Sequence, residues 1–231
     1  MHSMATPARR VDSPDDLDAR CAIRKEAQID AARRDPTAFV EWAIPHERTG
    51  KPLKCEPFHR EWQDICTADR NAVIMAPIEH AKTTQIAVAR MLWEVGRDPS
   101  LRCAVVSNTA TQAQKILGAT AAHITRNAAV REVFPGMVPS TAFRAPWNAS
   151  GITVERPTIA KEETIQATGV GGPINGARLD LVVLDDVCDF ENTRTRDQRE
   201  KLVEWYDSTL DRRITENGRV WILSLIHISD P

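Results

Sequence analysis

The stretch from residue 179 to residue 186 constrains the fold more than any other part of the chain. It reads Leu-Asp-Leu-Val-Val-Leu-Asp-Asp, so five of its first six residues are apolar and two carboxylates follow directly. A continuous apolar run is typical of a strand buried on both faces of a parallel sheet. Ligands of open α/β sheets bind at the carboxyl ends of the strands, where Asp185 and Asp186 would lie. The alternative is a strand that ends in a turn, where aspartate is common.

A second stretch, upstream of the first, predicts a phosphate-binding loop. Residues 71–84 contain a short apolar strand, a loop that ends in Lys82-Thr83, and the start of a helix. This layout resembles the pattern G-x-x-x-x-G-K-[ST], in which the lysine reaches the β- and γ-phosphates and the hydroxyl binds Mg²⁺. The match is imperfect, because Pro77 and Ala81 stand where the glycines are expected. Taken alone, the stretch could be an ordinary helix start.

The two stretches together predict one phosphoryl-transfer site that binds a nucleoside triphosphate and Mg²⁺. Lys82 would hold phosphates, and Asp186 would orient or deprotonate the attacking water. Thr83 and Asp185 are the expected metal ligands. The residues expected to cradle the nucleotide are Pro77, Ile78, Glu79, His80, Ala81, Lys82, Thr83 and Thr84.

The composition is that of a globular chain without a strong charge. Of the 231 residues, 42% are hydrophobic and 27% are charged, and the formal net charge is -2. Any contact with DNA therefore has to come from a local patch. No apolar run approaches the length of a membrane span, and the first ten residues lack the apolar core of a secretory signal. The cysteines form no C-x-x-C pair, which favours a reducing cytoplasm and argues against a zinc site.

The chain divides into three parts by pattern. We expect residues 1–50 to form a helical N-terminal extension and residues 51–223 to form an ATPase domain in which strands alternate with helices, which predicts a parallel sheet. Strands are expected at 72–76, 102–107, 152–156, 164–168, 181–184 and 219–223. Helices are expected at 17–34, 37–44, 57–67, 83–95, 111–126 and 196–213. Residues 224–231 resemble a translated sequencing adapter, and we interpret them as a non-native tail, the alternative being a genuine short C-terminus.

With these elements in place, the chain from Phe39 to Leu223 resembles the N-terminal ATPase domain of the large terminase subunit of tailed phages. The resemblance rests on segments in the family's order: 58–63, the loop 76–84 (Walker A), 105–109, 176–180, the strand ending in Asp185-Asp186 (Walker B), and 205–213. It implies an α/β P-loop NTPase of the additional-strand, RecA-like type, with a mainly parallel central sheet flanked by helices. It also implies that Gln63 contacts adenine.

The resemblance further implies a function and partners. The function is Mg²⁺-ATP hydrolysis that powers translocation of viral DNA into a procapsid. The implied partners are double-stranded DNA, the portal protein, the small terminase subunit and further copies of the chain in a ring. The implied location is the host cytoplasm, transiently at the procapsid, with no membrane involved.

The chain also departs from the family pattern. Many terminases carry an arginine inside the loop, where this chain has Ile78 and Glu79, and the second carboxylate is often glutamate rather than Asp186. The coupling motif and the nuclease domain expected after Leu223 are missing, so nuclease activity would belong to a full-length parent. Two alternatives stay open: a helicase-like DNA translocase, and a degenerate P-loop module that binds nucleotide without turnover.

Several further residues have two possible roles. His80 is expected to shape the loop rather than to carry protons. Arg178 could approach the γ-phosphate or pack at the start of the buried strand. Arg212 and Arg213 could act on a neighbouring copy, although an arginine pair is usually a solvated face. Residues 193–196 could touch DNA phosphate, with a solvated loop favoured. The tryptophans expected to pack in the core are Trp42, Trp62, Trp93, Trp205 and Trp221.

Overall fold

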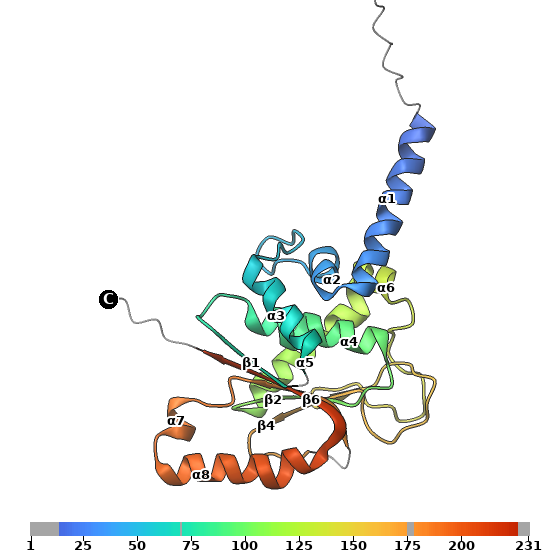
Figure 1. The fold of residues 1–231 in the computed structure, drawn as a ribbon. Helices are drawn as coiled ribbons and strands as arrows, with labels where there is room; N and C mark the ends of the chain where they lie inside the picture. The colour runs from blue at the N-terminus through green and yellow to red at the C-terminus, as the bar shows by residue number, and fades with distance from the viewer. Residues whose placement is uncertain (1–13, 70, 175–177, 226–231) are drawn as a thin grey trace, which may run out of the picture.

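The computed structural model describes residues 14–69, 71–174 and 178–225, and it has three layers. A six-stranded sheet lies in the middle, with helices on both of its faces (Figure 1). One helix, α1, projects from this body at the N-terminal side. The predicted α/β class with a central sheet flanked by helices is confirmed.

The strand order is β1-β6-β5-β2-β4-β3. The strands are β1 (Asn71–Ala76), β2 (Cys103–Ser107), β3 (Gly151–Ile152), β4 (Ile165–Gly169), β5 (Leu179–Asp185) and β6 (Ile214–Leu225). All neighbouring pairs are parallel except the short β3–β4 pair. One strand, β6, separates β1 from β5. This arrangement is the additional-strand type that the sequence predicts.

Strand β5 is apolar because both of its faces are covered. Leu181 and Val183 pack into the larger core on one side of the sheet, and Val182 and Leu184 pack into a second core on the other side. Strand β1 lies at the edge of the sheet and alternates instead, with Val73 exposed and its neighbours buried. The two patterns follow from strand position, because only a central strand has both faces buried.

The larger core is covered by the helices that follow the expected loop and the second strand. On this face lie α3 (Pro57–Ala68), the π-helical segment η1 (Thr83–Arg90), α4 (Met91–Arg97), α5 (Ala110–Arg126) and α6 (Ala128–Val133). On the other face lie α7 (Phe190–Thr193), α8 (Arg196–Trp205), the π-helical turn η2 (Tyr206–Leu210) and the 3₁₀ turn η3 (Asp211–Arg213). The expected helix 196–213 is thus a helix followed by two differently wound turns.

The N-terminal region is helical, as predicted. Helix α1 spans Pro14–Arg34 and α2 spans Pro36–Ala43, and Asp35 caps α2 by accepting a hydrogen bond from the Thr37 amide at 2.8 Å. The end of α1 meets the body where the Trp93 indole donates to the Ala32 carbonyl at 3.0 Å. Within the described ranges, no helix combines the length and the apolar character needed to cross a bilayer.

Further elements differ from the expectations. Helices α6 and α7 are not among the expected helices, and Asn127 starts α6 by accepting hydrogen bonds from the amides of Ala129 and Val130. The strand expected at 152–156 shrinks to the two residues of β3, because Val154 forms only an isolated bridge. Strand β6 starts at Ile214 and runs through 225, beyond the expected end at residue 223. Two parts of the expectations lie outside the described residues: residues 226–231 of the expected tail, and residues 176 and 177 of the segment 176–180.

Candidate functional site

The candidate site lies at the carboxyl edge of the sheet, where β1 and β5 end. The Lys82 ammonium donates to a carboxylate oxygen of Asp186 at 2.8 Å, although the two residues are 104 positions apart. The Thr83 hydroxyl lies 3.0 Å from each carboxylate oxygen of Asp185. The fold therefore brings together the four residues from which the sequence predicts phosphate and metal chemistry.

The loop after β1 has the backbone shape of a glycine loop without any glycine. Glu79 has φ 68° and Ala81 has φ 56°, both in the left-handed region that favours glycine. Each such residue costs about 1–2 kcal/mol. Aligned on Lys82, the first glycine of the pattern falls on Ala76, the last residue of β1, and not on Pro77 as the sequence analysis has it. Ala81 does occupy the second glycine position.

Two histidines hold this loop in shape: His59 contacts it from α3, and His80 is part of the loop itself. The His59 Nδ1 accepts from the Glu56 amide at 3.0 Å, which leaves Nε2 to donate to the His80 carbonyl at 3.0 Å. The His80 Nδ1 lies 3.0 Å from the Ile78 carbonyl oxygen. Burial lowers the pKa of His59 and so favours its neutral ring. These contacts support a loop-shaping role for His80.

Gln63 does not lie where the resemblance to terminases puts it. Its side chain is completely buried, and its amide nitrogen donates to the Gln85 carbonyl at 3.1 Å. Its amide oxygen accepts from Arg90 at 3.2 Å. Gln63 therefore holds the helix that follows the loop, and both ends of its amide are used there rather than on adenine.

Residues of η1, α4 and β6 form a buried charge cluster that was not predicted from the sequence. Arg90 pairs with Glu94 at 2.9 Å, and Arg219 from β6 makes two bonds to the same carboxylate at 2.9 and 2.8 Å. Burial acts to raise the pKa of Glu94, but the hydrogen bonds of Arg219 and the charge of Arg90 outweigh it and the pKa is lowered. The i,i+4 spacing of Arg90 and Glu94 was the available sequence signal.

The two carboxylates of the site sit in different environments. Asp185 is 7% exposed, and burial together with the negative charge of Asp186 raises its pKa to about 6, against the hydrogen bond from Thr83. Asp186 is more open, with a left-handed φ of 47°, and its amide donates to the Leu223 carbonyl at 3.0 Å. This hydrogen bond ties the backbone of Asp186 to β6.

The oxygen donors here form a small set that suits Mg²⁺. Thr83 and Asp185 supply hard oxygen atoms, which Mg²⁺ prefers. Among the described residues, no group of three or more His, Cys, Asp or Glu side chains is placed to hold a metal. Since Mg²⁺ usually keeps several waters and binds through one or two protein groups plus phosphates, this small donor set fits it.

Two cavities flank the Lys82–Asp186 ion pair. The first, the loop pocket, has a volume of about 410 Å³ and is lined by residues 77–84, Asp186 and Leu225. The second, the carboxylate cavity, has a volume of about 540 Å³ and reaches from Thr83 and Asp185 to Ser107 at the end of β2. Both volumes lie in the range of small-molecule sites. All the residues expected to cradle a nucleotide, apart from Gln63, line the loop pocket.

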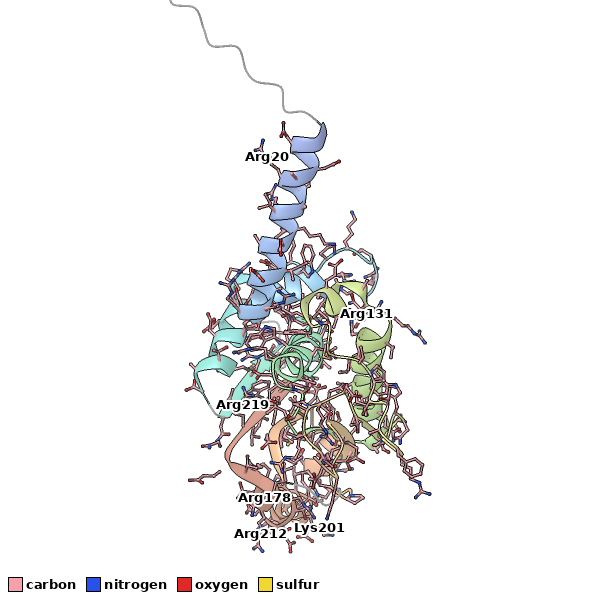
Figure 2. The ribbon with its side chains drawn as sticks, turned by 90° about the vertical axis from the view of Figure 1, so that its right-hand side faces the viewer. Arg20, Arg131, Arg178, Lys201, Arg212 and Arg219 are labelled. Atoms are coloured by element: carbon pink, nitrogen blue, oxygen red, sulfur yellow. The ribbon has the colours of Figure 1, made fainter. Side chains whose placement is uncertain are left out.

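The arginines with two possible roles lie away from the site. Arg178 is exposed and precedes β5, so it lies at the opposite end of that strand from Asp185. Arg212 and Arg213 are in η3, just before β6. Figure 2 shows Arg178 and Arg212 at the end of the molecule remote from Arg20. Within this chain, these arginines do not complete the site.

The other expectations are mostly met. In the segment 193–196, residues 194–196 are exposed, as expected for a solvated surface, whereas Thr193 is partly buried as the last residue of α7 and Arg196 begins α8. Trp62, Trp93 and Trp221 are buried, and Trp42 and Trp205 are partly buried.

Comparisons with known proteins place this fold. No protein-family model matches the chain, and no curated protein matches it. The large terminase of bacteriophage HK97 matches in structure with a TM-score of 0.54 and 14% sequence identity, over 83% of this chain and 37% of that chain. The chain therefore spans 37% of the length of the HK97 protein. At this identity the match shows a shared fold, in line with the resemblance expected from the sequence.

Two structures from Thermus phage P74-26 match more loosely. A mutant of its large terminase ATPase domain gives a TM-score of 0.45 and 19% identity, over 74% of this chain and 65% of that one. Another structure of the same domain gives a TM-score of 0.39 and 20% identity, over 69% of this chain and 61% of that one. The likeness of fold rests on the HK97 match, which has the higher TM-score.

Proposed function

We propose that this chain is the ATPase part of a phage large terminase, which hydrolyses Mg²⁺-ATP to move viral DNA into a procapsid. The observation that carries the proposal is the pair of contacts Lys82–Asp186 and Thr83–Asp185 across the carboxyl edge of the sheet. They join a loop with left-handed backbone positions to two carboxylates at the end of a buried strand. The fold shared with the HK97 large terminase supports the same conclusion.

Each residue of the site has a role in this proposal. The amides of the loop and of the start of η1 bind phosphate oxygens. Lys82 moves from Asp186 to the terminal phosphates, which frees the Asp186 carboxylate to orient the attacking water and take its proton. Thr83 and Asp185 would hold Mg²⁺, which when bound would neutralise charge on the phosphate oxygens. His59 and His80 keep the loop in shape throughout.

The remaining parts of the proposal concern the larger protein. Because this chain spans 37% of the HK97 terminase, the nuclease activity is assigned to the rest of a full-length parent. The proposed partners are double-stranded DNA, a portal protein, a small terminase subunit and further copies of the chain in a ring. The proposed place of action is the host cytoplasm, at the procapsid.

Replacing Lys82 tests the proposal. Lys82→Ala should abolish steady-state ATP hydrolysis, because the phosphates lose their only lysine contact from the loop. Lys201→Ala, on the opposite face of the sheet, is the matched control and should keep the wild-type rate. Hydrolysis by the Lys82→Ala variant at the wild-type rate, in this chain or in a full-length parent, would show that the site is elsewhere.

A second function is favoured by one observation. The loop has no glycine, and Glu79 and Ala81 add side chains where the backbone has to approach phosphates. This favours a module that binds nucleotide without turnover. Equilibrium binding of a fluorescent ATP analogue together with an absent steady-state rate, in chain and parent alike, would select this function over the motor.

A further inference from the structure

Ser107 carries a buried hydroxyl beside the two carboxylates. Neither the sequence analysis nor the proposed function gives this hydroxyl a role. It is the last residue of β2 and is 2% exposed. Its carbonyl accepts a hydrogen bond from the Val170 amide at 3.0 Å, but its hydroxyl has no hydrogen-bond partner among the described residues. A buried polar group without a partner costs stability, so such a group calls for an explanation.

The sheet register puts this hydroxyl next to Asp185. Ser107 and Asp185 are direct partners across the parallel β2–β5 pair, so their side chains point to the same face of the sheet. That face is the one on which Asp185 meets Thr83. The partner of Asp185 on its other side is Leu223, which is apolar. Across the sheet, Ser107 is therefore the polar neighbour of Asp185.

Ser107 and Asp185 both line the carboxylate cavity. A cavity of about 540 Å³ has room for several waters, and a buried water needs two to four polar partners. The charged residues that line the cavity are Glu47, Asp185, Asp186, Asp189 and Lys115. Four carboxylates and one lysine make the lining acidic, which suits water that hydrates a cation.

We propose that Ser107 is a positioning residue that holds a water between its hydroxyl and the Asp185 carboxylate, in the hydration shell of Mg²⁺. The inference rests on the proposed function, since it takes Mg²⁺ to be held at Thr83 and Asp185. A hydroxyl can donate one hydrogen bond and accept two, so Ser107 can hold a water that in turn donates to the Asp185 carboxylate. Groups that orient the ligands of a metal set its affinity without touching it.

The test measures metal affinity rather than turnover. Binding of a fluorescent ATP analogue to the full chain is titrated with Mg²⁺, in the wild type and in Ser107→Ala. We expect Ser107→Ala to raise the half-saturating Mg²⁺ concentration about tenfold. Binding of the analogue in excess chelator should stay unchanged. Ser107→Thr, which keeps a hydroxyl, should restore the wild-type Mg²⁺ dependence.

A second buried hydroxyl provides the matched control. Thr153 is 6% exposed, its hydroxyl also has no partner among the described residues, and it is not part of the carboxylate cavity lining. Thr153→Val should leave the Mg²⁺ dependence as in the wild type. An equal shift in Thr153→Val and Ser107→Ala would overturn the inference, because it would reduce the effect to general packing.

The remaining outcomes separate this inference from the proposed function. If the wild type binds nucleotide in a Mg²⁺-dependent way and Ser107→Ala does so with the same half-saturating concentration, the role of Ser107 is refuted and the proposed function stands. If the wild type shows no Mg²⁺-dependent nucleotide binding, both are refuted.

Discussion

Two charged clusters are built around the same helical segment, and they differ in how completely their charges are satisfied. In the cluster of Arg90, Glu94 and Arg219, every charged group has an oppositely charged partner, and the Arg90 and Glu94 side chains are 1% and 8% exposed. In the cluster of Lys82, Thr83, Asp185 and Asp186, two carboxylates lie side by side against one lysine, beside two cavities. A closed, paired cluster holds a fold together, whereas an open one with excess charge can exchange its partners for a ligand.

Glu94 gives the largest effect that the comparison predicts. Glu94→Ala removes the carboxylate shared by Arg90 and Arg219 and leaves Arg90 charged and buried. We expect the free energy of unfolding to fall by about 3–5 kcal/mol. Denaturant unfolding followed by circular dichroism measures this. Glu200→Ala, which removes an exposed partner of Arg196 at the same i,i+4 spacing, is the control and should cost under about 0.5 kcal/mol. Equal losses in the two variants would erase the distinction between the clusters.

Asp186 gives the opposite profile. Asp186→Asn keeps the shape of the side chain but removes the carboxylate that would take a proton from water. We expect ATP hydrolysis to fall about 100-fold or more. The free energy of unfolding should change by less than about 1 kcal/mol, because the ion pair with Lys82 is open to solvent on the Asp186 side. A variant that keeps its rate but unfolds easily would make Asp186 part of the scaffold.

Ala81 gives the smallest effect and concerns the strain in the open cluster. Ala81→Gly should raise the free energy of unfolding by about 1 kcal/mol, because glycine has no Cβ atom and adopts the left-handed backbone conformation without a steric cost. Ala119→Gly, in the middle of α5, has the opposite expected sign and should cost about 1 kcal/mol. If both changes destabilise the chain, the left-handed backbone at Ala81 is not a source of strain.

Much of the fold and of the site could be predicted because the relevant signals are local. The apolar run before Asp185 marks a central strand, and Lys82-Thr83 after an apolar strand marks the loop. Gln63 could not be placed from sequence, since its partners Gln85 and Arg90 come from a segment that only the packed structure brings against α3. Ser107 could not be found either, because its pairing with Asp185 depends on which strands are neighbours.

The position of β6 sets the distance between the loop after β1 and the carboxylates after β5. The strand hydrogen-bonds to β1 on one side and to β5 on the other. The loop and the carboxylates are therefore held two strand spacings apart, roughly 9.5 Å. The long side chain of Lys82 can span that gap to Asp186. The shorter side chain of Thr83 reaches Asp185 from η1, which packs on the sheet. Strand β6 contributes no side chain to the proposed chemistry, yet it sets the distance between the loop and the carboxylates. Any sideways shift of the loop relative to the carboxylates therefore has to change the hydrogen bonds of β6.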